Sequence, residues 1–310
     1  MNHDVVRVLI FLGIIGLTYC AAAVMVIRQW MGRSRAGERW LRRVIYGAAL
    51  AGVACMAYGY FVEPYWPQVT HVTIDASRLD GPRPVRIVQI SDLHCNAKPR
   101  LEGELPRIIA AQKPDLIVFT GDAINSLAGL PVFKRCMTAL AREAPTYAVR
   151  GNWDVDYWSR VDLFGGTGVR ELNGNAVKVS VAGASFWIAG AACEDEAAIH
   201  RALAAIPSGA FSVFLYHSPS GALEIARGGA KVCLVGDTHG GQVALPFYGA
   251  LTTGERFGKR FEAGLYRVGP MWLYVNRGIG MTGGLPPVRF CARPEVTVLT
   301  LRPGSLHAGA

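Results

Sequence analysis

The sequence predicts an α/β domain that follows a two-helix membrane anchor, and three observations support this. Two apolar runs near the N-terminus are long enough to cross a bilayer as helices. From Val85 onward, short apolar runs alternate with helix-like segments, which is typical of a layered α/β domain. Five of those runs end in Asp, Asn or His, which indicates a polar site at one edge of a sheet. A chain of 310 residues has room for a catalytic domain and such an appendage.

The two apolar runs, residues 8–27 and 44–62, contain no charged side chain. Each has close to the ~20 residues that a helix needs to cross the hydrocarbon core of a bilayer. A cleaved signal peptide is an alternative for the first run, but its length exceeds the about 7–15 apolar residues of such a peptide and a second run follows. A buried core hairpin is the alternative for the pair. We expect residues 1–62 to form the membrane anchor.

The loop between the runs is strongly basic, with six arginines from Arg28 to Arg43 against the single acidic residue Glu38. Such loops remain on the cytoplasmic side, so we expect both chain ends and the large domain to lie outside the cytoplasm. Of the seven cysteines, Cys20 and Cys55 lie in the apolar runs. The other five lack paired short spacing and are typical of free, buried thiols, which favours a reducing compartment: Cys95, Cys136, Cys193, Cys233 and Cys291. The cytoplasmic face therefore stays an alternative.

The net charge of +9 divides into +5 for residues 1–62 and +4 for the rest of the chain. So small an excess on the large domain does not indicate nucleic acid as a partner. A membrane with anionic lipids, or an anionic substrate, accounts for it.

Residues 63–84 contain several prolines and the turn-rich stretch "SRLDGPRP", which predicts a linker or a first edge strand. The catalytic domain then covers 85–303, and a short tail covers 304–310. Helix-like segments near 101–112 and 131–144 have the length of crossover connections between parallel strands.

The polar tips follow the runs "VRIVQI", "PDLIVFT", "TYAVR", "FSVFLY" and "KVCLV". Any one tip is better explained by an ordinary turn, but chance does not explain five strands that all end in residues of ligand type. Because ligands bind at the carboxyl ends of strands in α/β sheets, we expect the tips to converge. The candidate metal ligands are Asp92, His94, Asp122, Asn152, His217, Asp237 and His239.

This ligand set mixes imidazole nitrogen with carboxylate and amide oxygen and has no thiolate, which suits Mn²⁺, Fe, Zn²⁺ or Mg²⁺. Seven ligands exceed what one ion uses, so two divalent ions that share a carboxylate are the economical interpretation. Two ions about 3.5–4 Å apart can activate water and hold both oxygens of an in-line displacement. The pattern therefore predicts phosphoryl chemistry.

The motifs "SDLH", "TGD", "GNWD", "YHSP" and "GDTHGGQ", over residues 85–242, resemble those of the calcineurin-like metallophosphoesterases. The closing stretches "LYVNRGIG" and "CARPEVTVLTL" resemble the membrane-associated branch of that family, which includes bacterial phosphodiesterases and a UDP-2,3-diacylglucosamine pyrophosphatase of lipid A synthesis. The resemblance implies a four-layer α/β/β/α sandwich and a location in the bacterial inner membrane. It also implies that Asp92, His94 and His239 hold one ion, that Asp122 bridges, and that Asn152 and His217 hold the other.

Two positions depart from the family pattern, which has histidine at both. Asp237 adds negative charge and favours harder ions, so Mn²⁺ is the metal that we expect first; its shorter reach alternatively leaves the second ion weakly held. Trp153 can be neither a ligand nor a general acid. The loss of a positioned acid costs about 10²–10⁴-fold when the leaving group needs a proton, which favours a phosphoanhydride over a simple diester.

Three further expectations concern the surroundings of the site. Arg277 is predicted to contact a phosphate, with a core-capping arginine as the alternative. Asp154 is predicted to cap a turn. Core packing is predicted for four aromatic residues, with an acyl or base pocket as the alternative: Trp158, Phe247, Tyr248 and Phe257.

The sequence thus predicts a metal-dependent phosphohydrolase in which Asp122 and Asn152 act in catalysis. Its expected substrate is a membrane-associated phosphoanhydride or phosphodiester, either lipid-linked or nucleotide-linked. UDP-2,3-diacylglucosamine is one candidate, although an outward-facing domain would not meet that cytoplasmic precursor. The alternative is a non-catalytic membrane protein that keeps the fold as a binding module.

Overall fold

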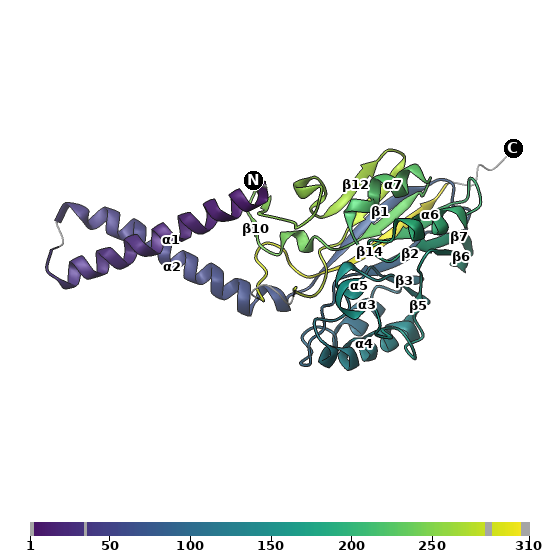
Figure 1. Ribbon diagram of the computed structural model, residues 1–310, viewed down its shortest axis with the longest axis horizontal. Helices are drawn as coiled ribbons and strands as arrows, with labels where there is room; N and C mark the ends of the chain where they lie inside the picture. The colour runs from purple at the N-terminus through teal and green to yellow at the C-terminus, as the bar shows by residue number, and fades with distance from the viewer. Residues whose placement is uncertain (1–2, 34–35, 283–286, 305–310) are drawn as a thin grey trace.

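The computed structural model describes residues 3–33, 36–282 and 287–304. Two long helices, α1 (His3–Trp30) and α2 (Arg39–Phe61), form a hairpin that projects from an α/β body (Figure 1). Both helices are long and apolar enough to cross a membrane. None of the most apolar stretch of α1 and only 6% of that of α2 is buried in the protein, so the core-hairpin alternative is wrong.

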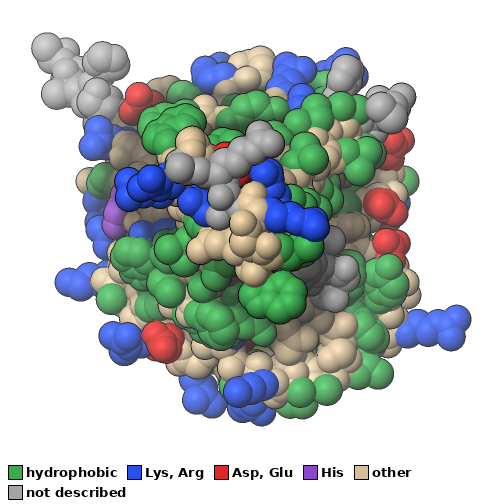
Figure 2. All heavy atoms as spheres, turned by 90° about the vertical axis from the view of Figure 1, so that its left-hand side faces the viewer, with side chains coloured by type: hydrophobic (Ala, Val, Ile, Leu, Met, Phe, Trp, Pro, Cys, Tyr) green, Lys and Arg blue, Asp and Glu red, His purple; other side chains and the backbone are tan. Residues whose placement is uncertain are grey.

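The tip of the hairpin carries the basic loop. Arg28 at the end of α1 forms an ion pair with Glu38 at a distance of 3.0 Å. With six arginines against this one acidic residue, the loop keeps an excess of positive charge. Figure 2 looks onto this end and shows Lys and Arg side chains around the tip with apolar side chains behind them. The charge distribution predicted from the sequence is therefore present on the folded hairpin.

Gly59 in the last turn of α2 and Glu63 just after the helix join the hairpin to the body. The Gly59 carbonyl accepts a hydrogen bond from the backbone N–H of Arg289 at 2.9 Å. Glu63 is buried, and its carboxylate accepts the backbone N–H groups of Cys291 and Ala292 at 2.9 and 2.6 Å. The segment around 289–292 is thereby fixed to the anchor, and this segment also reaches the polar site described below.

The body contains two six-stranded sheets in the described part of the chain. The first sheet has the order β1-β14-β2-β3-β4-β5 and the second has the order β12-β13-β9-β8-β7-β6. The first comprises β1 (Gln68–Ala76), β2 (Val85–Ile90), β3 (Leu116–Phe119), β4 (Thr146–Ala148), β5 (Arg170–Glu171) and β14 (Glu295–Pro303). The second comprises β6 (Asn175–Val181), β7 (Ala184–Gly190), β8 (Ser212–Leu215), β9 (Val232–Val235), β12 (Gly264–Val268) and β13 (Met271–Val275).

Three buried clusters define four layers. One lies between the sheets and joins Ile87 and Val118 of the first to Val213 and Leu234 of the second. A second cluster covers the outer face of the first sheet with α3 (Leu105–Ala110) and α4 (Leu130–Glu143). A third covers the second sheet with α6 (Glu196–Ala204) and α7 (Ala222–Arg227). The strands β3 and β9 are continuous apolar runs, and β8 is buried along its whole length, because both faces of these strands are covered. The predicted α/β/β/α sandwich is confirmed.

Residues 68–76 decide between the two predictions for the segment after the anchor. They form β1, which pairs in parallel with β14 from Gln68 opposite Glu295 to Ala76 opposite Pro303. An edge strand, rather than an unstructured linker, therefore connects the anchor to β2. The tail that we predict over 304–310 lies outside the described residues except for Gly304.

The prediction of core packing holds for two of the four aromatic residues and is wrong for the other two. Trp158 and Phe257 pack against buried clusters, as expected. Phe247 is fully exposed and Tyr248 is half exposed, so the prediction is wrong for these two. They form the turn between β10 (Ala244–Leu245) and β11 (Gly249–Ala250), a small hairpin beside α1 rather than over the sheets. The five cysteines outside the two helices are free, as predicted; four of them are buried, but Cys291 is exposed, so the prediction of a buried thiol is wrong there.

Candidate metal centre

Strand ends from both sheets meet at one edge of the body. In the first sheet, β2, β3 and β4 run parallel and lead into Asp92, Asp122 and Asn152. In the second sheet, β8 and β9 run parallel and lead into His217 and Asp237. Five candidate ligands hold a positive φ, which is rare for residues other than glycine and clusters at functional sites. They are Asp92 (52°), His94 (43°), Asp122 (61°), Asp237 (71°) and His239 (51°).

A first cluster consists of Asp92, His94 and His239, whose ligand atoms lie within 4.8 Å of one another. The His239 Nε2 atom is 3.4 Å from Asp92 Oδ1, and the rings of His94 and His239 stack with centroids 5.2 Å apart. All three side chains are buried. This is one of the two ligand sets that the resemblance implies, brought together by the fold.

A second cluster consists of Asp92, Asp122 and His217, within the same limit of 4.8 Å. The His217 Nε2 atom lies 3.4 Å from Asp122 Oδ2, 3.9 Å from Asp92 Oδ1 and 3.6 Å from Asp237 Oδ1. Asp92 therefore belongs to both clusters. The Asp122 Oδ2 atom is also 3.3 Å from His94 Nε2, so Asp122 lies between the clusters, where a bridging ligand would have to be.

Hydrogen bonds on the far side of two rings orient their free nitrogens toward the clusters. The His217 Nδ1–H donates to the Thr120 carbonyl at 2.6 Å. His94 Nδ1 pairs with Asn125 Oδ1 at 2.9 Å, and the Asn125 amide nitrogen donates to two carbonyls, which assigns its oxygen to His94. The Nε2 atoms of both rings are buried without a hydrogen-bond partner, as is Asn152 Oδ1. A histidine that binds a metal through one ring nitrogen usually has its other ring nitrogen held by a hydrogen bond. The two rings therefore have the arrangement expected of metal ligands.

The electrostatics of the centre also fit cations. Burial and the charge of Asp122 raise the pKa of Asp92. Burial acts against ionisation of Asp122, but His217 and His94 hold its pKa well below the usual value. Burial opposes a charge on His217, yet Asp122 and Asp237 raise its pKa well above the ordinary range. In the described part of the chain, no lysine or arginine forms an ion pair with these carboxylates, so divalent ions would supply the missing positive charge.

Asp154 caps a turn, as the sequence predicts. It is buried, and its carboxylate accepts the backbone N–H groups of Asp122, Ala123 and Gly151 at 2.9, 2.9 and 3.0 Å. These bonds join the loop after β3 to the start of α5 (Asn152–Trp158). Burial and the nearby Asp122 raise the pKa of Asp154 to about 6. Asp154 thus positions Asp122 and Asn152 without taking part in either cluster.

Trp153 lies beside the first cluster. Its ring meets the edge of His94 with centroids 5.6 Å apart and packs on Tyr157 at 4.7 Å. Its backbone N–H donates to Asp122 Oδ1 at 3.0 Å. The main chain at this position is therefore engaged with the centre, while the indole cannot supply a ligand or an acid.

Arg277 lies next to the glycine-rich loop but is engaged by other residues. Its guanidinium pairs with Glu295 and with the Gln68 amide oxygen, both at 3.2 Å. The side chain also covers Gly240, where an added Cβ would meet Arg277 at 2.9 Å. Its contact with a phosphate stays a prediction.

Sequence reasoning missed Arg289, Asn125 and Glu255. Arg289 is fully buried; it donates to the Gly280 and Ala292 carbonyls and lies 3.2 Å from His239 Nδ1. Glu255 accepts a hydrogen bond from Ser218 and interacts with Asp237. Asn125 lies in the loop after β3, three residues beyond Asp122, and neither Arg289 nor Glu255 directly follows a strand of the predicted pattern, so no local signal marked the three.

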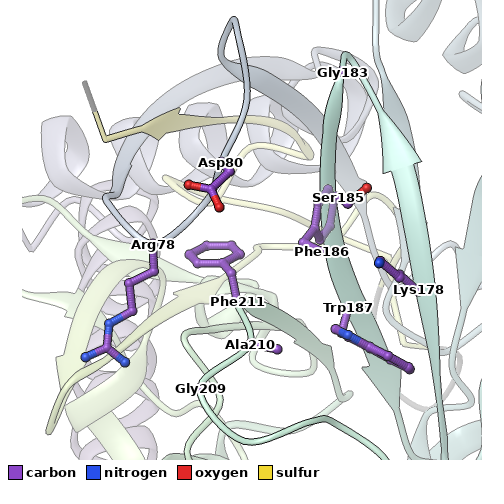
Figure 3. Close-up of a pocket in the computed structure, with 10 residues that line it drawn as sticks. All are labelled: Arg78, Asp80, Lys178, Gly183, Ser185, Phe186, Trp187, Gly209, Ala210 and Phe211. Atoms are coloured by element: carbon purple, nitrogen blue, oxygen red, sulfur yellow. The ribbon is translucent and has the colours of Figure 1, made fainter. Parts of the chain in front are cut away.

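A separate cavity of about 530 Å³ lies away from the centre (Figure 3). Arg78, Lys178, Trp187 and Phe211 contribute to its walls. It lies where β7 and β8 begin, whereas the candidate ligands follow the carboxyl ends of strands. None of the candidate metal ligands lines it, so its size does not make it the functional site.

Paired clusters of buried Asp and His at the edge of a two-sheet sandwich define a metal-dependent hydrolase. Residues 85–241 match the family model for calcineurin-like phosphoesterases. The chain is 33% identical to the uncharacterized metallophosphoesterase YkuE of Bacillus subtilis, over 86% of this chain and 97% of that protein. It is 28% identical to the phosphodiesterase YaeI of Escherichia coli, over 84% and 98% respectively. The chain belongs to the calcineurin-like phosphoesterase family and is a hydrolase.

Proposed function

We propose that the protein is a dinuclear metal-dependent phosphohydrolase that cleaves a phosphoanhydride, or an activated phosphodiester, of a membrane-associated substrate. The observation that carries the proposal is the pair of ligand clusters that share Asp92 and are linked through Asp122. Asp92, His94 and His239 would hold one ion and Asn152, His217 and Asp237 the other, with Asp122 shared by both and Asp92 within reach of both. Bound divalent ions would supply Lewis acidity and lower the pKa of water.

The residues of the chain have separable roles in this proposal. Thr120 and Asn125 fix the rings of His217 and His94, so each presents Nε2 to the centre. Asp154 holds the backbone that carries Asp122 and Asn152. Trp153 cannot donate a proton to a leaving alkoxide, which favours a leaving group of low pKa such as a phosphate.

Mn²⁺ is the ion that we propose first. With Asp237 beside His217, the second cluster has three carboxylates within reach of one imidazole. Hard oxygen ligands favour Mn²⁺ or Mg²⁺ over softer ions. Zn²⁺ and Fe remain compatible with the imidazole-rich first cluster.

The membrane enters the proposal through the hairpin. We propose that residues 1–62 anchor the enzyme as two membrane-spanning helices and that residues 85–303 are its catalytic domain. The basic loop supports an outward-facing catalytic domain in a bacterial inner membrane. A reporter fused after Ser305 tests the side, and a cytoplasmic reporter signal would contradict it. An outward-facing domain counts against UDP-2,3-diacylglucosamine as the natural substrate, whereas a cytoplasmic one would favour it.

The enzyme proposal is tested with the full-length protein in detergent and Mn²⁺. We expect hydrolysis of bis(4-nitrophenyl) phosphate and of UDP-2,3-diacylglucosamine as a pyrophosphate-linked lipid probe. Asp122→Ala should abolish both activities, while Asp162→Ala, at an exposed carboxylate paired with Lys134, should abolish neither. Bound metal without turnover of either probe would overturn the proposal and favour a binding module.

A further inference from the structure

The hairpin formed by β10 and β11 is an apolar projection beside α1. Residues 243–251, "VALPFYGAL", contain no charged side chain. Its two short strands pair antiparallel from Ala244 opposite Ala250, so Phe247 and Tyr248 lie at the tip. Figure 1 shows β10 next to the N-terminal end of α1. We call residues 243–251 the β10–β11 finger.

The tip of the β10–β11 finger exposes Phe247 in a strained conformation. Its side chain is fully exposed, and its backbone has a φ of 65°. A positive φ is an outlier for a bulky residue and persists only where the surrounding structure imposes it. A fully exposed aromatic ring gains no stability from burial in the body. The tip therefore has features that the packing of the body does not explain.

Lys259 and Glu262 fix the tip from behind. The Lys259 ammonium group donates to the carbonyls of Tyr248 and Ala250 at 2.6 and 3.0 Å and forms an ion pair with Glu262 at 2.6 Å. It also lies 4.0 Å from the centre of the Tyr248 ring. Glu262 accepts the backbone N–H of Ala250 at 3.2 Å. The exposure of the neighbouring Phe247 is thus a consequence of a turn held by specific contacts.

The β10–β11 finger lies level with the start of the membrane span. Tyr248 lines a hollow of about 240 Å³ together with four residues of α1, from Arg7 to Ile14. Arg7 is the last charged residue before the uncharged run 8–27. Ile14 lies about 10 Å further along the helix, which rises 1.5 Å per residue. The finger therefore accompanies the first two turns of the run that would enter the bilayer.

The base of the β10–β11 finger is joined to the loop that carries His239. Gly241, two residues after His239, approaches the finger so closely that an added Cβ would collide with Ala250. The Thr238 hydroxyl donates to the carbonyl of Glu262, the residue that also holds the tip, at 2.6 Å. The position of the finger therefore fixes the position of this edge of the metal centre.

We propose that the β10–β11 finger inserts Phe247 into the interface of the lipid bilayer, as a third membrane contact besides the two helices, and so holds the metal centre near the lipid headgroups. The inference rests on the membrane anchor of the proposed function. The partner is a bilayer because the finger lies beside the uncharged run of α1, which lipid would surround. Aromatic side chains are enriched at this depth, and an uncharged segment inserts without the cost of desolvating a charge.

Spin labels on the full-length protein in phosphatidylcholine–phosphatidylglycerol nanodiscs test the contact. The label replaces Phe247 in Phe247→Cys. Leu17→Cys, at an exposed position of α1, is the membrane reference. Lys178→Cys is the water reference, since it is exposed on β6 at the end of the body far from the hairpin (Figure 1). The exposed native thiols are removed in every protein by Cys20→Ser, Cys55→Ser and Cys291→Ser.

We expect the label at 247 to collide with oxygen more often, and with a water-soluble nickel chelate several-fold less often, than the label at 178. The label at 17 should behave in the same way. Free access of nickel at 247 with shielding at 17 would overturn the finger and leave the anchor standing. Shielding at 247 from both reagents would indicate a protein surface and overturn the bilayer as partner. Free access of nickel at both positions would overturn the anchor and the finger together.

Activity separates this inference from the hydrolase. Phe247→Glu should raise the KM for UDP-2,3-diacylglucosamine in vesicles several-fold and leave the KM for soluble bis(4-nitrophenyl) phosphate unchanged. Phe247→Trp, which keeps an interfacial aromatic ring, should match the wild type, and Lys178→Glu should change neither KM. An equal rise for both substrates in Phe247→Glu would overturn the membrane role of the finger. A membrane-like label at 247 without turnover of either probe would support the finger and overturn the phosphohydrolase.

Discussion

The two ligand clusters share Asp92 but differ in charge. The first joins one carboxylate to the two imidazoles of His94 and His239. The second joins Asp92 and Asp122 to the single imidazole of His217, with the Asp237 carboxylate 3.6 Å from its Nε2 atom. Imidazole-rich sets suit borderline ions, and carboxylate-rich sets suit hard ones. The same edge of the body therefore offers two metal positions, and each favours a different class of ion.

The clusters also differ in how their histidines are held. His94 and His239 of the first depend on the side chains of Asn125 and Arg289. His217 of the second is held by the main-chain carbonyl of Thr120. Side-chain supports can be removed by substitution, whereas a main-chain support cannot. The comparison predicts that the two positions respond differently to mutation.

The largest effect is expected at the residue that both clusters share. Asp92→Asn should remove both ions and lower kcat/KM by about 10³-fold or more, because several kcal/mol of transition-state stabilisation is lost. Metal content per chain and turnover of bis(4-nitrophenyl) phosphate measure this. Asp75→Asn, on the exposed face of β1, should change neither value. If Asp92→Asn retained one tightly bound ion, the sharing of Asp92 would be wrong.

Asp237 should affect the second position alone. Asp237→Ala should lower the metal content from two ions to one and reduce turnover about 10²-fold, in the range of a single lost electrostatic stabiliser. Asp237→His, which restores the family pattern, should retain two ions and shift the preference from Mn²⁺ toward Zn²⁺. Metal competition followed by elemental analysis distinguishes these outcomes. Full occupancy in Asp237→Ala would contradict a role in binding the second ion.

Asn125 should affect the first position alone. Asn125→Ala frees the His94 ring, and the loss of such a support typically lowers metal affinity by about 10- to 100-fold. Titration of apoprotein with Mn²⁺ should show one weakened step and one unchanged step. Asn125→Asp, which can still accept from Nδ1, should recover most of the affinity. Weakening of both steps to the same extent would show that the two positions are not separately supported.

The sequence predicts those residues of the metal centre that follow a strand, and it does not predict those that distant parts of the chain contribute. Asp92, Asp122 and His217 each follow a buried apolar strand, so a local pattern places them at a common edge. Arg289 follows no such strand, and Asn125 lies three residues beyond the Gly-Asp pair that ends the run of β3. Arg289 reaches His239 across 50 residues, and β1 finds β14 across more than 220, so neither contact has a local signal.

The exposed turn at Phe247 and Tyr248 is a second feature that the sequence does not predict. Aromatic residues in an α/β domain are usually buried, and hydrophobicity alone predicts core packing for both. Tyr248 lines a hollow together with residues of α1, which lie more than 230 residues away in the chain. Only the folded arrangement indicates that an apolar side chain here faces the anchor rather than the sheets.

The smallest effect concerns Trp153, which flanks the first cluster without belonging to it. Its backbone N–H to Asp122 would persist in any variant, so Trp153→His would place an imidazole next to His94 on an unchanged main chain. We expect turnover of diesters with alkyl leaving groups to rise about tenfold, since a positioned acid assists leaving groups of high pKa. Turnover of the pyrophosphate probe should not change, because its leaving group needs no proton. Trp153→Phe, which adds no acid, should give no gain. An equal gain for every leaving group in both variants would show that the indole obstructs access to the centre, and the preference for an anhydride would then lose its chemical basis.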